Sequence, residues 1–297
     1  MSTIGFDTSN YTTSTAWTDG KTDINVRQIL YVKDGERGIR QSDGVFQHMK
    51  LMPVMYEKLS EQIDFKDVKA VGVSTRPRCV EGSYMPVFLA GEGYAKVVAN
   101  TVGVPLYEFS HQDGHIMAGI YSSGSFELLE NDFISVHLSG GTTEILKSRY
   151  NGFNFDNEII GGSKDISAGQ FIDRVGVKMG LHFPAGKALE QLALKAEQGE
   201  KLPTAVDGAY MNFSGVETKA SRMAESERCD KSALALGVLE NVRDTLVKTI
   251  NKAMTDTNTH RVLIVGGVAS NGIIRNGLTK KLDGDVYFAK AEYSTDN

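Results

Sequence analysis

Cysteine and proline are scarce in this sequence, and each scarcity excludes a class of protein. The 297 residues include 2 cysteines, Cys79 and Cys229, and 6 prolines. Two cysteines cannot build a disulfide framework, which indicates a reducing cytoplasm. No apolar run is long enough to span a membrane, and the first ten residues lack the basic and apolar regions of a secretory signal. We therefore expect a cytoplasmic protein with no membrane partner.

Basic charge is also lacking, while glycine is abundant. Lys and Arg number 32 against 37 Asp and Glu, which gives a net charge of −5. A protein that wraps nucleic acid by itself is usually basic, so composition gives no support for nucleic-acid binding. The 31 glycines are typical of turns at which the backbone approaches a ligand closely. The length suits two lobes.

The sequence divides into two halves that begin alike. Composition changes to Ser, Gly and Glu around residues 122–132, so we expect lobes at 1–125 and 126–297. Each half starts with a strand, a turn of small residues and a second strand, and the turns are residues 7–10 and 139–142. This duplication resembles the actin-like ATPases, which predicts an α/β fold with two RNase H-like lobes around a nucleotide cleft. The alternative is that both turns only join hairpin strands.

Hydrophobic spacing predicts the other elements. Met49, Met52, Met55 and Leu59 indicate a helix over 45–63. A polar turn is expected at 213–219, and two β-prone segments between 148 and 160. Further helices are expected at 87–102, 167–179, 187–198, 231–256 and 271–282, and strands at 70–75, 104–109, 133–138, 142–148 and 261–265.

His111 and His115 are the candidate metal ligands. If their segment is helical, a spacing of four places both imidazoles on one face, where they can bind one metal ion. The alternative is two surface histidines on an ordinary helix. A zincin protease needs Glu directly after the first histidine to activate the metal-bound water. Gln112 occupies that position, and an amide cannot act as a base, so a protease mechanism is excluded.

Two segments of the second half are candidates for nucleotide contacts. GGVASN, residues 266–271, follows an apolar strand and opens a helix, whose N-terminus favours anions. Asn271 can present an amide donor and acceptor to a purine, or it can cap that helix. Asp173 can accept from ribose hydroxyls, or it can form a surface ion pair with Lys178 or Arg174. Gly186 suits close contact with a sugar or base.

The motifs taken together resemble one family. IGFDTS, HQDGH, LSGGTTE, GQFIDRVGVKMGLHFPAG, FSGVETK, GGVASN and STDN follow one another between residues 3 and 297. Each motif is weak alone, but their order and spacing are similar to those of the tRNA threonylcarbamoyladenosine synthases, formerly labelled glycoproteases or O-sialoglycoprotein endopeptidases.

The resemblance implies a tRNA-processing transferase of the actin-like ATPase fold. Such an enzyme passes a threonylcarbamoyl group from an adenylate to an adenosine of tRNA, with ATP or an adenylate as its nucleotide substrate. The adenosine amine attacks the carbamoyl carbon and AMP leaves, without a covalent nucleophile on the protein. The resemblance also implies one metal ion, iron or zinc, and partner subunits of a tRNA-modifying complex. It assigns metal binding to His111, His115 and Asp296, and substrate or adenylate binding to Leu138, Ser139, Gly140, Gly141, Thr142, Asp173, Gly186, Glu190 and Asn271.

Departures from the family pattern leave the acceptor open. Thr142 replaces a histidine of the usual SGGHT loop, Arg76-Pro77-Arg78 replaces GPG, and the sequence ends at Asn297, where members usually continue. These departures allow a small-molecule acceptor, or a nucleotide-binding partner subunit without catalysis. Retention of all three metal positions favours an enzyme. An actin-like kinase would need an aspartate near the second turn, where the nearest carboxylate is Glu144, so we disfavour it.

Overall fold

The computed structural model describes residues 1–9, 11–32 and 39–294, which form two compact units. Unit 1 comprises Met1–Met117, and unit 2 comprises residues 118–294. The division lies inside helix α3 (His111–Ser123), N-terminal to the boundary expected at residue 125. In the described ranges, no helix is both long and apolar enough to cross a bilayer.

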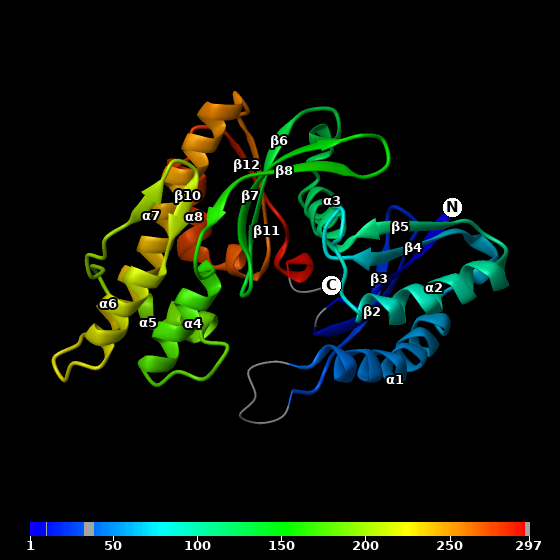
Figure 1. Ribbon diagram of the computed structural model, residues 1–297, viewed down its shortest axis with the longest axis horizontal. Coiled ribbons are helices and arrows are strands. Elements are labelled where there is room, and N and C mark those ends of the chain that lie inside the picture. Colours follow the sequence, from blue (N-terminus) through cyan, green and yellow to red (C-terminus); the bar gives the residue numbers. More distant parts are fainter. Residues whose placement is uncertain (10, 33–38, 295–297) are drawn as a thin grey trace. The chain divides into compact units, whose positions relative to one another are not determined.

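Unit 1 is a five-stranded sheet with two helices on one face (Figure 1). The strand order is β3-β2-β1-β4-β5. β1, β2 and β3 are antiparallel neighbours, whereas β4 runs parallel to β1 and β5 runs parallel to β4. The strands are β1 (Ser2–Asp7), β2 (Thr12–Thr18), β3 (Asp23–Ile29), β4 (Val68–Arg76) and β5 (Leu106–Ser110), and the helices are α1 (Gln41–Ser60) and α2 (Phe88–Val102).

The core of unit 1 follows from two periodicities. In β1, Ile4 and Phe6 alternate with less buried residues and point into the core. In α1, Met52, Met55 and Leu59 are buried at helical spacing. Met49 was expected on the same face, but it is 48% exposed, because the buried stripe of α1 passes through His48 instead.

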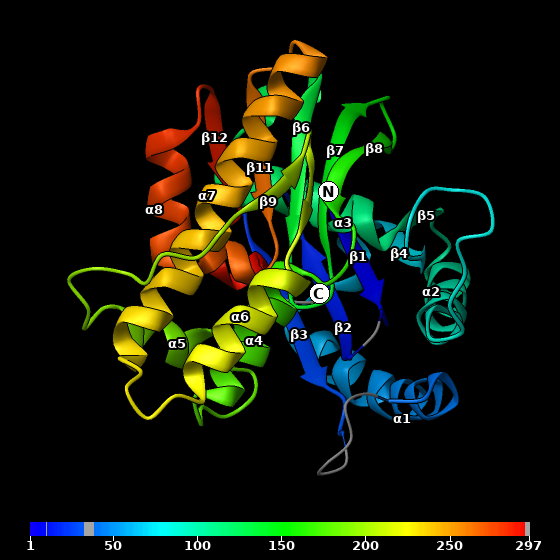
Figure 2. The same ribbon diagram turned by 60° about the vertical axis from the view of Figure 1, so that its left-hand side comes forward.

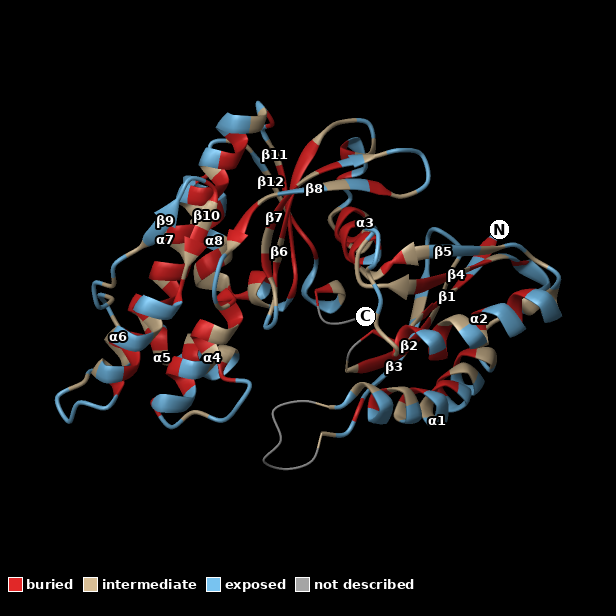
Figure 3. Ribbon diagram, in the orientation of Figure 1, coloured by how far each residue is buried: buried red, intermediate tan, exposed pale blue. Residues whose placement is uncertain are grey.

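Unit 2 is a seven-stranded sheet of order β12-β11-β6-β7-β8-β10-β9. The helix α7 packs against α5 and α8 (Figure 2). Buried residues line the inward faces of these helices, and exposed residues line the outward faces (Figure 3). The strands are β6 (Phe133–Leu138), β7 (Thr143–Tyr150), β8 (Phe155–Ser163), β9 (Ala205–Asp207), β10 (Tyr210–Asn212), β11 (Arg261–Val265) and β12 (Asp285–Phe288), and the helices are α4 (Ala168–Lys178), α5 (Gly186–Ala193), α6 (Ser214–Ala224), α7 (Lys231–Thr257) and α8 (Gly272–Lys281). Short 3₁₀ segments occur at Phe65–Asp67, Phe126–Leu129, Gly267–Ser270 and Ala291–Tyr293.

The two units share a topology, which confirms the predicted duplication. The order β8-β7-β6-β11-β12 repeats β3-β2-β1-β4-β5, with two antiparallel pairs followed by two parallel pairs in each case. In both units the parallel strands therefore end at one edge of the sheet. Ligands bind at such carboxyl edges in open α/β sheets.

Two local expectations were wrong. A single strand, β8, replaces the two β-prone segments expected before residue 160. Residues 213–219 were expected to form a polar turn, but Ser214 begins helix α6. Val216, Ala220 and Ala224 recur at a spacing of four and are buried, which stabilises the helix by packing one apolar face.

Candidate functional site

The two predicted metal-binding histidines converge in unit 1. Both lie on α3, where the expected spacing of four is realised as adjacent turns of helix. His111 Nε2 and His115 Nε2 lie 2.9 Å apart. The two rings meet edge to face, with centroids 4.3 Å apart. Because His111 follows β5 directly, this histidine pair lies at the carboxyl edge of the unit 1 sheet.

Asp7 fixes the orientation of the first histidine. Its Oδ2 accepts from His111 Nδ1 at 2.9 Å, and its Oδ1 accepts from the Ser9 amide at 2.6 Å. Burial alone would raise the pKa of Asp7, but the attraction of His111 in its protonated form and the hydrogen bonds from His111, Ser74 and Ser9 outweigh it and lower the pKa. With Nδ1 engaged by a carboxylate, Nε2 of His111 is the nitrogen that faces His115.

These groups fit a divalent metal ion. Metal-bound imidazole nitrogens lie about 2.0–2.1 Å from zinc, so two on one ion lie within about 4.2 Å of each other. The separation of 2.9 Å between the two Nε2 atoms satisfies this limit. A carboxylate on the far nitrogen of a ligating histidine is the usual arrangement around protein metals. Nitrogen ligands of this kind suit zinc and iron.

The third residue predicted to bind the metal lies outside the described residues. Asp296 was predicted as the third ligand, and residues 295–297 are not among those described. Among the described residues, no three His, Cys, Asp or Glu side chains form a group able to hold a metal. Asn10, the last residue of the turn predicted at 7–10, is likewise not described. Thr8 of that turn donates to the Val87 carbonyl at 2.8 Å and so holds the turn against the start of α2.

The predicted turn of unit 2, residues 139–142, is called the SGGT turn. The Ser139 amide donates to the Thr142 carbonyl at 2.9 Å, and the Thr142 amide donates to Ser139 Oγ at 3.1 Å, which closes the turn. Gly140 and Gly141 are exposed. Within the described part of the chain, neither of their amides donates a hydrogen bond. Two such amides on one turn can receive a phosphate oxygen without a side chain in the way.

The start of helix α4 contacts the SGGT turn and holds it in place. Ser167 Oγ donates to the Gly140 carbonyl at 2.7 Å, and Ser167 with Gln170 forms a capping box at the start of α4. A Cβ on Gly169 would lie 2.5 Å from Gly140 Cα, so only glycine permits this approach. Leu138, which precedes the turn, is fully buried in the sheet, and its carbonyl would lie 2.5 Å from a Cβ on Gly266. Leu138 therefore positions the turn and contributes no exposed side chain.

Asp173 has a different partner from the one expected. The alternative of a surface ion pair with Lys178 or Arg174 is wrong, because Lys178 pairs with Glu225 at 2.7 Å and, among the described residues, Asp173 forms no ion pair. Asp173 Oδ1 instead accepts from the Ala185 amide at 2.7 Å, just before α5 begins at Gly186. Burial raises the pKa of Asp173, and hydrogen bonds from the Ala185 and Gly186 amides offset part of that rise. The carboxylate thus caps α5.

Glu190 and Asn271 meet at the start of α8. Glu190 Oε1 accepts from the Gly272 amide at 2.6 Å. Asn271 Oδ1 caps the same helix by accepting from the Ile273 and Ile274 amides, each at 3.1 Å. The carbonyl oxygen of Asn271 is therefore occupied, and a purine can receive only its amide donor. Across the described ranges, no acceptor is bonded to Asn271 Nδ2.

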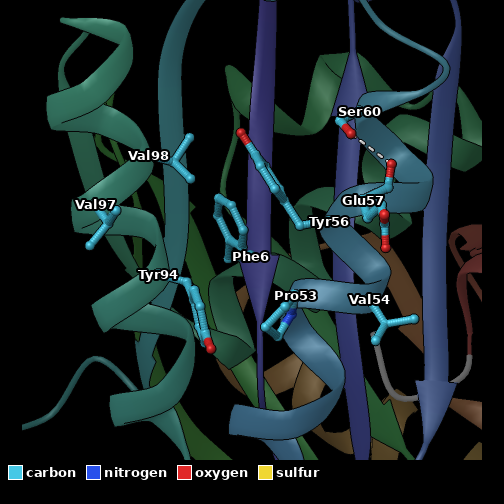
Figure 4. Close-up of a pocket in the computed structure, with 9 residues that line it drawn as sticks. All are labelled: Phe6, Pro53, Val54, Tyr56, Glu57, Ser60, Tyr94, Val97 and Val98. Carbon is cyan, nitrogen blue, oxygen red and sulfur yellow. Dashed lines mark hydrogen bonds between the residues drawn. The ribbon is translucent and has the colours of Figure 1, made fainter.

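A groove of about 560 Å³ lies elsewhere on unit 1 (Figure 4). It runs between α1 and α2, with Phe6 of β1 between side chains of the two helices. Its lining residues are Phe6, Pro53, Val54, Tyr56, Glu57, Ser60, Tyr94, Val97 and Val98. None of the residues predicted from sequence lines it, so the groove is separate from the candidate site.

The sequence did not reveal the partners of these residues. Asp7 and His111 are 104 positions apart, and Glu190 and Gly272 are 82 apart. The one available signal was the position of Asp7 at the end of a predicted strand, before a turn of small residues. Asp165 was missed altogether, although it accepts from the Phe213 amide at 2.8 Å and the Ser214 amide at 2.9 Å and so caps α6.

Solved structures with the same fold include those of HypF and of a dehydratase activator. HypF of T. kodakarensis superposes with a TM-score of 0.63 at 13% identity, over 100% of this chain and 46% of that one. The activator of the 2-hydroxyisocaproyl-CoA dehydratase from Clostridium difficile, solved with bound ADPNP, has a TM-score of 0.55 at 14% identity, over 99% of this chain and 91% of that one. This chain spans about half the length of HypF. At these identities the likeness shows the fold alone, which is that of the actin-like ATPases.

Sequence comparison is more specific. A family model described as tRNA N6-adenosine threonylcarbamoyltransferase, TsaD, matches residues 37–297. A protein of that name from Thermus thermophilus is 30% identical over 100% of this chain and 90% of its own length. Its counterpart from Christiangramia forsetii is 29% identical over 83% of this chain and 74% of its own length. With the ordered motifs and the converged histidine pair, these matches show that the chain belongs to the TsaD family of threonylcarbamoyl transferases.

Proposed function

We propose that this chain transfers a threonylcarbamoyl group from an adenylate to the N6 amine of an adenosine in tRNA, with a divalent metal ion, iron or zinc, held by the histidine pair. The observation that supports this function best is the 2.9 Å approach of His111 Nε2 and His115 Nε2 in a chain of this family. A subunit that only binds nucleotide would not need two imidazoles held at this separation. Asp296 is the proposed third ligand.

The proposed reaction is a single displacement at the carbamoyl carbon. The adenosine amine forms a C–N bond to that carbon, the C–O bond to the phosphoryl group breaks, AMP leaves with the electron pair, and the amine proton passes to water. When bound, the metal would polarise a donor oxygen. Asp7 accepts from His111 Nδ1, so Nε2 of His111 stays directed toward His115 Nε2. No side chain is required as a covalent nucleophile.

The residues of unit 2 are proposed to hold the adenylate. The Gly140 and Gly141 amides would donate to its phosphate, with Thr142 and Ser139 closing the turn. Asn271 Nδ2 would donate to the adenine base. Asp173 would accept from a ribose hydroxyl through the oxygen that does not cap α5.

Gly186 and Glu190 complete this proposed set. Gly186 is the first residue of α5, and a Cβ there would meet no atom within 4 Å, so a sugar or base could approach its backbone. Glu190 would act indirectly, by holding the start of α8, at which Asn271 lies. We also propose that the chain works in a reducing cytoplasm and together with further protein subunits.

A transfer assay on the purified protein tests the function. Threonylcarbamoyl-adenylate with a radiolabelled threonyl group is mixed with unmodified tRNA, and label on tRNA is counted. We expect transfer by the wild type, loss in His115→Ala, and no loss in His260→Ala, which removes an exposed histidine of unit 2. Wild-type protein that retains metal and binds AMP, yet transfers no label, would contradict transfer by this chain on its own.

A further inference from the structure

Arg76 is a charged residue at the carboxyl edge of the unit 1 sheet that the proposed reaction has not used. It is the last residue of β4, and its Cα partner on β5 is Ser110, the residue before His111. The segment that follows Arg76 packs on α3, the helix of the histidine pair, because the Gln112 amide donates to the Pro77 carbonyl at 3.1 Å. Arg76 therefore ends its strand beside the first turn of α3.

The guanidinium of Arg76 is oriented but not neutralised. Nη1 donates to Thr75 Oγ1 at 3.1 Å, and Nη2 lies 3.6 Å from Cys79 Sγ. Both acceptors are uncharged groups. Over the ranges that the structure describes, no carboxylate lies within 4 Å of this guanidinium. Asp7, the acidic residue of the same edge, is engaged by His111 and Ser9.

A half-buried guanidinium of this kind is suited to an incoming anion. Its planar fork matches the two oxygens of a carboxylate or phosphoryl group, and such charge-assisted pairs are the stronger hydrogen bonds. Partial burial of Arg76 reduces the screening of its charge by water. The loop that follows is fixed by the Arg78 amide, which donates to Ser83 Oγ at 3.0 Å, so the end of β4 does not lead into an unsupported segment.

We propose that Arg76 binds an oxyanion of the threonylcarbamoyl donor, either the carboxylate of its threonyl part or its phosphoryl group, and holds the donor beside the histidine pair. The proposal rests on the proposed function for the identity of the donor. It assigns a substrate-binding role to a residue that replaces the first glycine of the usual GPG motif. Arg76 is thereby a specificity-determining position.

Calorimetry with two stable probes tests the proposal. N-carbamoyl-L-threonine presents the carboxylate without phosphate, and AMP presents the phosphate without the threonyl part. We expect Arg76→Ala to raise the Kd of one probe about ten- to hundredfold, the range expected for loss of a charge-assisted hydrogen bond. Arg76→Lys, which keeps the charge and loses the fork, should fall between wild type and Arg76→Ala. The probe that responds identifies the oxyanion.

Controls separate local binding from charge and folding. Arg27→Ala removes an exposed arginine of β3 and should leave both Kd values unchanged. Metal content and melting temperature should match wild type in all three variants, and in the transfer assay Arg76→Ala should raise KM for the donor with kcat nearly unchanged.

Three results would overturn the proposal. The first is that Arg76→Ala binds both probes with the Kd values of wild type. The second is that Arg27→Ala raises the Kd of a probe as much as Arg76→Ala does. The third is that Arg76→Ala weakens the binding of tRNA and of neither probe. A wild type that binds neither probe and transfers no label would contradict the proposed function as well.

Discussion

The carboxylate of Asp173 has two roles that one substitution series can separate. It caps α5 through the Ala185 amide, and it is proposed to bind the ribose of the adenylate. Asp173→Asn keeps an acceptor oxygen for the amide but removes the charge. Asp173→Ala removes both the oxygen and the charge. The two variants therefore differ in the cap and share the loss of the proposed ribose contact.

The magnitude of the stability effect follows from the contacts. Loss of a side-chain cap costs about 0.5–2 kcal/mol, so Asp173→Ala should lower the free energy of unfolding by about that amount. Asp173→Asn loses a favourable charge at a helix N-terminus, worth about 0.3–1 kcal/mol. The same substitution removes the free-energy cost of burying the charge, which is the desolvation that raises the pKa of Asp173. The loss and the gain oppose each other. We expect Asp173→Asn to lie close to wild type.

The pH dependence provides a second readout. Because the folded pKa of Asp173 is raised above its ordinary value of 3.8, this shift stabilises the fold below about pH 3.8 and the benefit is lost as pH rises through the folded pKa. Wild type should therefore gain stability relative to Asp173→Asn as pH falls from neutrality toward 4.

Thermal and denaturant unfolding measure the first role, and calorimetry with ATP and AMP measures the second. A loss of 1 kcal/mol corresponds to about 2–4 °C in melting temperature for a unit of this size. Asp173→Asn should weaken nucleotide binding by about 1–3 kcal/mol, the cost of a lost charge-assisted hydrogen bond. Equal melting of Asp173→Ala and wild type would refute the capping argument. Equal nucleotide affinity of Asp173→Asn and wild type would refute the ribose contact.

Three further predictions concern other parts of the chain. His111→Ala and His115→Ala should each lose stoichiometric metal, measured by elemental analysis of purified protein, since removal of one protein ligand is rarely tolerated; full occupancy in both would contradict the site. Gly169→Ala should destabilise by about 1–3 kcal/mol, because its Cβ would lie 2.5 Å from the SGGT turn, whereas Gly215→Ala in α6, whose Cβ meets nothing within 4 Å, should be neutral or slightly stabilising in the same unfolding assay. Hydrogen bonds overcome the effect of burial and lower the pKa of Asp165 to about 2, so wild type should lose this stabilisation as pH falls from about 4 to 2, and Asp165→Asn should lack that loss; parallel acid-unfolding curves would refute it.

Elements with strong local patterns were predicted well. β6 and β11 have the expected bounds, because each is a short apolar run closed by a small-residue turn. The spacing of His111 and His115 suggested a helix as the way to bring them to one face, and α3 confirms that helix. α6 was missed because its first residues are polar, and its buried stripe becomes evident only from Val216 onward.

The sequence by itself determined the duplicated lobes, the family and the histidine pair, because each depends on residues close together or on motifs in a fixed order. Tertiary structure alone decided what those residues contact. Asp7 reaches His111 only because β1 and β5 flank β4 in one sheet, and Glu190 reaches Gly272 only because α5 and α8 both pack against α7. Such pairings leave no local pattern, since a hydrogen bond between segments 82 or 104 positions apart depends on how the intervening chain folds. The packing of the chain thus assigned Asp173 to a helix cap and left Arg76 without a carboxylate partner among the described residues.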